Sequence, residues 1–141
     1  MEKAKRVLVA LKTAEQVHDL INLACCVTAP DSSLSIIHVI ELPPVTPLDA
    51  EIPEVQASAE KILDAAEEEA RRGGLKARVE ILRARSAADA LLDEMKEHGF
   101  ELAIIGHHHR PRMVESLIGT TSSRLAERAP CRVLISIPPR V

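Results

Sequence analysis

One segment of the chain, residues 104–126, concentrates the side chains that could carry chemistry. It reads IIGHHHRPRMVESLIGTTSSRLA: Gly106 ends a short apolar run, three histidines follow it, and Gly119 precedes four hydroxyl residues. Hydroxyl groups in the first turn of a helix, beside its unpaired backbone N–H groups, can hold a phosphate. The same hydroxyls are also common helix caps, so the local pattern fits a phosphate site or capping alone.

The three consecutive histidines, His107–His109, raise the question of a metal site. Metal ligands must converge on one ion, whereas consecutive side chains diverge, and no cysteine or carboxylate lies at a zinc-site spacing from them. We therefore expect solvated or capping histidines and no resident metal. We also expect His38, inside another apolar run, to be a packed or strand-end histidine.

Known sequence signatures of catalysis are missing from the chain. It contains no G-x-S-x-G, no G-x-x-x-x-G-K-[ST] and no G-x-G-x-x-G. No nucleophile and base stand out as a pair, and no carboxylate near the histidine segment stands out as a holder of Mg²⁺. The residues alone therefore favour binding over catalysis.

The elements that must position these residues follow from the hydrophobic periodicity. Short β-branched runs predict strands, and the longer amphipathic stretches between them predict helices. The expected strands are residues 6–11, 33–42, 76–84, 101–106 and 131–137, and the expected helices are residues 14–27, 55–72, 87–98 and 120–129. Such alternation implies right-handed crossovers and a parallel sheet between two layers of helices.

Local signals refine the helices. Thr13 with Gln16, and Ser86 with Asp89, have the spacing of capping boxes at helix starts. The charged helix at residues 55–72 is expected to carry Glu–Arg pairs four residues apart, Glu67–Arg71 and Glu68–Arg72.

The expected topology also predicts where a ligand would bind. Parallel α/β sheets bind ligands beyond the carboxyl ends of their strands, near the point where the strand order reverses. The strand ends in question are Leu11–Thr13, His38–Leu42, Ala84–Ser86 and Ile105–His109. The histidine segment therefore begins where a site is expected.

Composition limits the class of protein. The chain has 141 residues, of which 46% are hydrophobic, so we expect a single domain over residues 1–141 with a substantial core. Phe100 is the only aromatic residue among Phe, Tyr and Trp, and the net charge is −3, so we expect no nucleic-acid partner. The apolar run near the N-terminus is too short for a signal peptide or a membrane span. Cys25, Cys26 and Cys131 make no disulfide framework, which favours the cytoplasm.

The chain resembles the universal stress protein family along nearly its whole length. The resemblance is carried by RVLVALKT, LSIIHVIE, ELAIIGHHHR and GTTSSRLAERAPCRVLISIP. The family signature is a glycine, two residues, a second glycine, nine residues, and a glycine followed by Ser or Thr. Gly106, Gly119 and Thr120 match it with the spacing intact, and His109 replaces the middle glycine.

The resemblance implies a fold and a mode of assembly. The fold is a Rossmann-like three-layer α/β sandwich of the adenine nucleotide alpha hydrolase-like type, with a five-stranded parallel sheet in the order 3-2-1-4-5. The function implied is that of a small cytoplasmic stress-response module that binds ligands or partners and is not an enzyme. Family members pair as homodimers through their final strands, here Arg132–Ile137, and an apolar edge strand of this kind tends to find a partner.

Some branches of the family bind ATP or another adenine nucleotide, with Mg²⁺ only as the companion of the nucleotide. The phosphates would lie between the glycine loop and the final helix, and the base and ribose near the ends of the first two strands. The residues that the resemblance assigns to this site are Ala10, Lys12, Val39, Ile105, Gly106, His109, Gly119, Thr120, Thr121 and Ser122.

Three departures from the family pattern leave alternatives open. His109 replaces a glycine, Lys12 replaces an acidic residue, and Arg85 replaces a glycine beyond the third strand. Lys12, Arg85, Arg110 and Arg112 would make the mouth of the site more positive, which suits an anion or a different nucleotide; the other interpretation is that these four residues are surface charges. The first alternative is a stress dimer that binds no nucleotide and acts through protein partners; the second is a slow ATP hydrolase.

Overall fold

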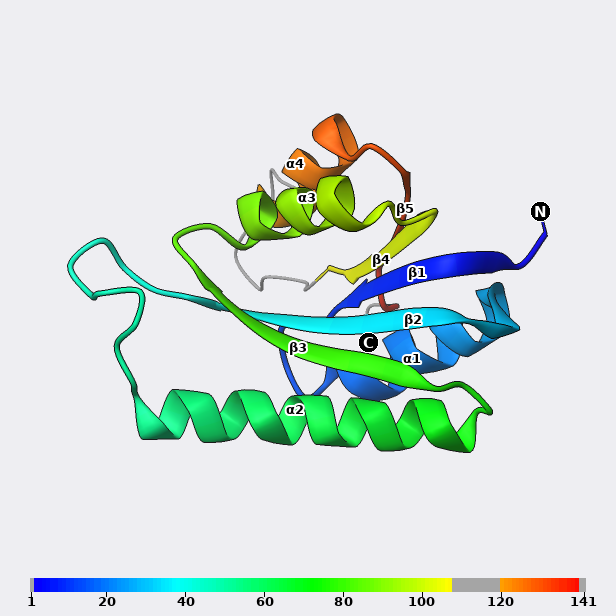
Figure 1. The fold of residues 1–141 in the computed structure, drawn as a ribbon, viewed down its shortest axis with the longest axis horizontal. Helices are drawn as coiled ribbons and strands as arrows, with labels where there is room; N and C mark the ends of the chain where they lie inside the picture. Colours follow the sequence, from blue (N-terminus) through cyan, green and yellow to red (C-terminus); the bar gives the residue numbers. More distant parts are fainter. Residues whose placement is uncertain (1, 108–119, 140–141) are drawn as a thin grey trace.

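The chain forms one alternating series of strands and helices, as the periodicity predicts (Figure 1). The computed structural model describes residues 2–107 and 120–139. The strands are β1 (Ala4–Ala10), β2 (Thr28–Glu41), β3 (Ala77–Ala84), β4 (Leu102–Gly106) and β5 (Arg132–Ser136). The helices are α1 (Gln16–Val27), α2 (Pro53–Arg72), α3 (Ala87–His98) and α4 (Thr120–Arg128).

All five strands belong to one parallel sheet, in the order β3-β2-β1-β4-β5. This confirms the predicted fold class. Val9 of β1 lies opposite Ile36 of β2 on one side and Ile104 of β4 on the other. The strand order reverses between β1 and β4, so the switch point lies at their carboxyl ends.

Alternate residues of the central strands supply two separate cores. Val7 and Val9 pack with α1 and α2, whereas Leu8, between them in sequence, packs with α3. Both sets are almost wholly buried, as a parallel sheet covered on both faces requires. Figure 1 shows the resulting layers, with α1 and α2 on one face of the sheet and α3 and α4 on the other.

Two element boundaries differ from the sequence prediction. Strand β2 begins at Thr28, directly after α1, and runs through Pro30, because Thr28 pairs with Ala4 before the register shifts between Ala4 and Arg6. Helix α2 begins at Pro53 rather than near Val55. Proline suits the first helical position, where its missing N–H group needs no partner.

The two predicted capping boxes have opposite outcomes. The Ser86 hydroxyl accepts a hydrogen bond from the Asp89 N–H at 3.2 Å and caps α3, as predicted. The prediction for Thr13 is wrong, because α1 begins at Gln16 and its N-cap, Glu15, makes no side-chain cap. The Gln16 side chain instead accepts a hydrogen bond from the Lys12 N–H at 2.8 Å, and this bond fixes the turn after β1.

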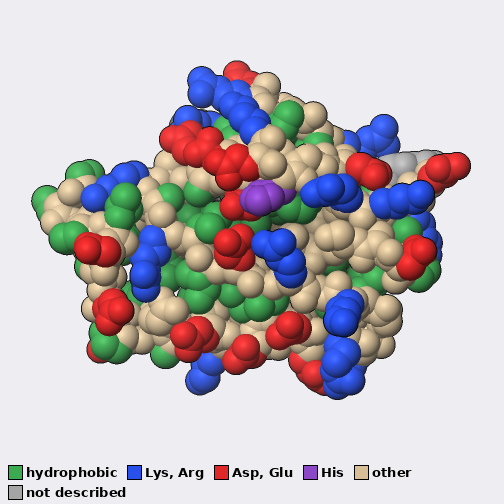
Figure 2. Space-filling view, viewed as in Figure 1, with side chains coloured by type: hydrophobic (Ala, Val, Ile, Leu, Met, Phe, Trp, Pro, Cys, Tyr) green, Lys and Arg blue, Asp and Glu red, His purple; other side chains and the backbone are tan. Residues whose placement is uncertain are grey.

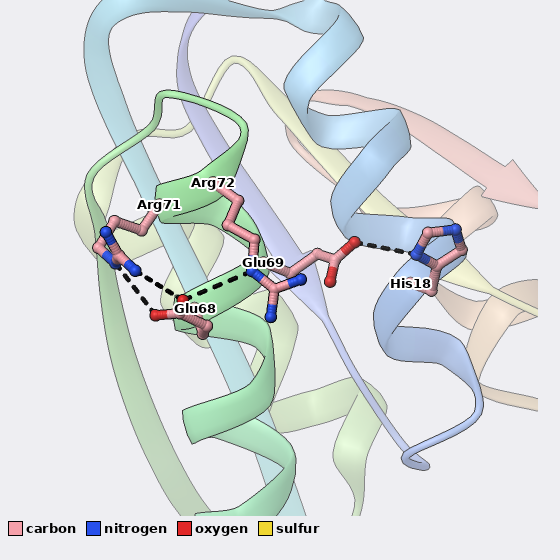
Figure 3. Close-up of polar contacts among 5 residues, drawn as sticks. All are labelled: His18, Glu68, Glu69, Arg71 and Arg72. Atoms are coloured by element: carbon pink, nitrogen blue, oxygen red, sulfur yellow. Dashed lines mark hydrogen bonds and ion pairs between the residues drawn. The ribbon is translucent and has the colours of Figure 1, made fainter.

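Ion pairs cover the outer face of α2 and connect it to α1 (Figure 3). Arg71 contacts Glu68 at 2.6 Å rather than the predicted Glu67, and Arg72 contacts Glu68 at 3.5 Å as predicted. The hydrogen bond from Arg71 lowers the pKa of the Glu68 carboxyl below its usual value. His18 of α1 contacts Glu69 at 2.9 Å, which joins the two helices.

The face shown in Figure 2 carries acidic and basic side chains interspersed with one another. Hydrophobic side chains gather on the protruding loop between β2 and α2, where Val45 is 91% exposed and Leu48 is 44% exposed. Within residues 2–107 and 120–139, no helix combines the length and apolar character needed to cross a membrane.

Replacing Ile36 with alanine should destabilise the fold strongly, because Ile36 is 0% exposed in the middle of β2. We expect Ile36→Ala to lower the free energy of unfolding by about 2–5 kcal/mol in urea titrations followed by circular dichroism. The control Val45→Ala removes an exposed methyl pair and should change it by less than about 0.5 kcal/mol. Equal effects of the two substitutions would contradict this assignment of the core.

Candidate functional site

The main cavity of the described structure opens at the carboxyl ends of β1, β2 and β4, where the topology predicts a site. It has a volume of about 270 Å³. The N-termini of α3 and α4 complete its rim. Its lining residues are Ala10, Leu11, Lys12, Gln16, Ile37, Val39, Glu41, Ser86, Ala87, Ala88, Leu91, Ile105, Gly106, His107, Thr121, Ser122 and Arg124.

The fold brings most of the residues assigned to the nucleotide site to this cavity. Those that line it are Ala10, Lys12, Val39, Ile105, Gly106, Thr121 and Ser122. Thr120 is the first residue of α4, and its side chain is outside what the structure describes. His109 and Gly119 also lie outside the described residues, as do Arg110 and Arg112. Residues distant in sequence thus converge, although their role in binding stays a prediction.

The floor of the cavity is apolar. Ile37 and Ile105 come from β2 and β4, and Leu91 comes from α3; all three are buried. Ala10 and Val39 are half-buried beside them. Apolar walls with a few polar groups at the rim are typical of small-molecule sites, and this floor offers a surface for a flat heterocycle.

The N-terminus of α4 supplies a polar side of the cavity. Ser122 is only 4% exposed, and Thr121 is half-buried beside it. The first turn of a helix presents unpaired N–H groups and a partial positive charge. Together with the hydroxyls, this helix end can hold an anion next to Gly106, where β4 ends.

Side chains of α1 approach Gly106 closely. A Cβ atom at this position would lie 2.6 Å from Nε2 of Gln16 and 3.3 Å from Cδ1 of Leu20. Gln16 therefore packs directly on the end of β4 while its other terminal atom bonds to the Lys12 N–H. Sequence reasoning treated Gln16 only as part of a cap and missed its place in the cavity wall.

The two cations expected at the mouth of the site have different positions. Lys12 lines the exposed rim, and its ammonium has no hydrogen-bond or ion-pair partner among the described residues. Arg85 does not line the cavity, which favours the surface-charge interpretation for this residue. Its guanidinium donates to the carbonyl oxygens of Pro43 and Thr46 in the proline-rich loop, each at 2.5 Å.

Arg124 is a cavity residue that sequence reasoning missed. It extends from α4 to the start of α3, where it contacts Oδ1 of Asp89 at 2.7 Å and the Ser86 hydroxyl at 3.4 Å. The sequence could have indicated this, because Arg124 follows Thr121 by three residues and both therefore lie on one face of α4.

Glu41, the last residue of β2, is a second missed residue. It lines the cavity, and its Oε2 atom accepts a hydrogen bond from the Ala87 N–H at 3.2 Å. Its position inside the strand-end range His38–Leu42 was the available signal.

The described histidines near the sheet have distinct environments. His38 is half-buried, and its Nδ1 atom lies 2.8 Å from the Leu11 carbonyl oxygen, as expected for a packed strand-end histidine. His107 is 9% exposed and lines the cavity, and its backbone N–H donates to the Ser136 carbonyl at 2.9 Å. Of the histidines expected to be solvated or capping, His107 is therefore buried.

A group of possible metal ligands lies elsewhere, on the last turns of α3. Side-chain atoms of Glu94, Glu97 and His98 lie within 4.8 Å of one another, and none of the three lines the cavity. Partial burial, and next the neighbouring carboxylate of Glu80, raise the pKa of Glu94 above its usual value. This group does not include His107–His109, the histidines for which the sequence raised the question of a metal site.

Comparison with known families gives one match. The model described as "Universal stress protein family" matches residues 3–136, which is most of the chain. No curated protein sequence matches the chain significantly.

Solved structures share the fold over nearly the whole chain. A universal stress protein in complex with cAMP is 19% identical with a TM-score of 0.73, covering 97% of this chain and 100% of its own. The universal stress protein of Archaeoglobus fulgidus in complex with dAMP is 16% identical with a TM-score of 0.69, covering 92% and 95%. A family protein of Arabidopsis thaliana with AMP bound is 14% identical with a TM-score of 0.66, covering 94% and 91%. At these identities the similarity establishes the fold.

Removing the Ser86 hydroxyl should destabilise the start of α3 at the cavity rim. We expect Ser86→Ala to lower the free energy of unfolding by about 1 kcal/mol, because the Asp89 N–H loses its cap. Chemical denaturation measures the change. Ser58→Ala, on the exposed side of α2, is the control and should be neutral or slightly stabilising. A neutral Ser86→Ala would show that this cap contributes nothing to stability.

Proposed function

Since the chain belongs to the universal stress protein family, we propose that it is a small binding module that holds an adenine nucleotide at the carboxyl edge of its sheet. Binding, rather than turnover, carries the function. The observation that supports this most directly is the single cavity that gathers an apolar floor, an exposed lysine and the N-terminus of a helix.

The cavity matches the two ends of a nucleotide. Ile37, Val39 and Ile105 offer the apolar surface that a purine base requires. The N-terminus of α4, with Ser122, offers the N–H and hydroxyl donors that a phosphate requires. Lys12 adds a positive charge to the rim.

The known ligands of structurally similar proteins agree with this choice. Proteins of the same fold are described with cAMP, dAMP and AMP, which share an adenine base and a phosphate. The ligand proposed for this chain is therefore an adenine nucleotide of the AMP or ATP type, with Mg²⁺ only as its companion.

The engaged state of the nearby carboxylates supports binding over hydrolysis. A phosphoryl-transfer site needs groups that hold Mg²⁺ and orient the attacking water. Glu41 accepts the Ala87 N–H, and Asp89 is paired with Arg124 at 2.7 Å. Each carboxylate therefore has one oxygen engaged by a structural partner, which holds the side chain in place.

We further propose that the protein is a cytoplasmic homodimer paired through residues 132–137. Strand β5 is at the edge of the sheet and pairs with β4 on one side. Val133, Leu134 and Ile135 are only half-buried there, and Ile137 is 50% exposed. An apolar edge of this kind gains burial by pairing with a second copy.

Adenine nucleotides should raise the melting temperature of the protein. A ligand at about 100 times its Kd stabilises the folded state by about 2.7 kcal/mol. We expect AMP or ATP at millimolar concentration to shift the thermal unfolding curve of the wild type, and Ala10→Leu, which fills the cavity floor, to lose the shift. Ala57→Leu on the exposed face of α2 is the matched control and should retain it.

Failure of every adenine nucleotide to shift the wild type would overturn this proposal and favour a dimer that acts through protein partners. Phosphate release from ATP above that of a heat-inactivated sample would instead favour the hydrolase alternative.

A charge at the edge strand should dissociate the dimer. We expect Ile137→Lys to convert the wild-type dimer to a monomer in sedimentation velocity experiments, because lysine at an edge opposes strand pairing. Val45→Lys, on the distant and exposed loop, should leave the sedimentation coefficient unchanged. A wild type that sediments as a monomer would contradict the pairing.

A further inference from the structure

We infer that Glu41 selects ligands that carry free ribose hydroxyls, and this inference rests on the proposed nucleotide-binding function. Glu41 ends β2 at the rim of the cavity. No other residue in the described lining has a carboxylate side chain. It is therefore the one described lining residue whose side chain can act only as an acceptor when ionised.

The two oxygens of Glu41 have different surroundings. Oε2 accepts the Ala87 N–H at 3.2 Å, at the N-terminus of α3, which holds the carboxylate in one orientation. Oε1 has no hydrogen-bond partner within the described part of the chain. One oxygen thus anchors the side chain, and the other is left to accept a hydrogen bond from a ligand.

The chemistry of a carboxylate decides which part of a nucleotide lies beside it. Phosphate oxygens are anionic acceptors, so a carboxylate repels them, whereas a ribose diol provides two O–H donors. In doubly wound nucleotide-binding sheets, an acidic residue of this kind hydrogen-bonds the ribose hydroxyl. The ribose is therefore the part of an adenine nucleotide that fits Glu41.

The order of Glu41, Lys12 and Gly106 along the edge of the sheet gives the ligand a direction. Glu41 ends β2, Lys12 follows the neighbouring strand β1, and Gly106 ends β4 beyond it. The N-terminus of α4 and Ser122 line the cavity with Gly106. The sugar consequently lies over β2, and the phosphate lies toward β4 and α4, with Lys12 between them.

The test compares AMP with 2′,3′-dideoxy-AMP by isothermal titration calorimetry on the wild type and on Glu41→Gln. Glutamine keeps an oxygen for the Ala87 N–H but removes the charge. For the wild type we expect loss of both hydroxyls to weaken binding by about 10- to 100-fold, because a hydrogen bond to a charged acceptor is lost. For Glu41→Gln we expect AMP itself to bind more weakly and the two ligands to differ by only a few-fold.

Glu127→Gln, on the exposed side of α4, is the matched control and should retain the wild-type preference. Circular dichroism melting curves establish that each variant folds. If Glu41→Gln does not fold, equal binding of the two ligands by the wild type still overturns the inference.

The outcomes separate the proposed nucleotide-binding function from the proposed role of Glu41. A wild type that binds neither ligand overturns the nucleotide-binding function and the role of Glu41 together. A wild type that binds AMP and dideoxy-AMP equally overturns the role of Glu41 alone. IMP, which lacks the amino group of adenine, distinguishes the base from the sugar. Glu41 would be assigned to the base if Glu41→Gln weakened the binding of dideoxy-AMP but not that of IMP. That result would overturn the inference.

Discussion

Strand β1 is enclosed on all four sides, and the rest of the structure depends on that enclosure. It has β2 and β4 on its edges and helices on both faces, so Val7, Leu8 and Val9 are fully buried. Helix α1, the helix after β1, packs on one face of the sheet, and α4, the helix after β4, packs on the other. Because these connections diverge, the carboxyl edge between them stays open. The cavity is thus a product of strand order, and the side chains at the strand ends decide what it can hold.

The sheet could be predicted from sequence because its strands are short, continuous and apolar, a pattern that buried parallel strands impose. The start of β2 could not be predicted, because a proline such as Pro30 normally ends regular structure. The extended conformation there depends on the pairing of Thr28 with Ala4, which is distant in sequence. The false cap at Thr13 has a similar cause. A capping box and an isolated turn contain the same residue types, and only the path of the chain out of β1 separates them.

The candidate site was predictable where it depends on strand ends and not where it depends on side-chain direction. Val39 and Gly106 lie in the strand-end ranges that the topology predicts, whereas Ala10 was assigned through the family resemblance. The side-chain directions of Arg124 and Arg85 could not be predicted in this way, because each extends over a neighbouring element to reach its acceptors.

The contact between Gly106 and Gln16 has a consequence for sequence variation. A Cβ atom at position 106 would have to displace the end of the Gln16 side chain, and the backbone of Gly106 does not adopt a left-handed conformation. The constraint therefore belongs to the pair of positions. A relative with a smaller residue at position 16 can tolerate alanine at position 106, so the two positions should covary. The first glycine of the loop is then an indicator of how the first helix begins, as well as of phosphate binding.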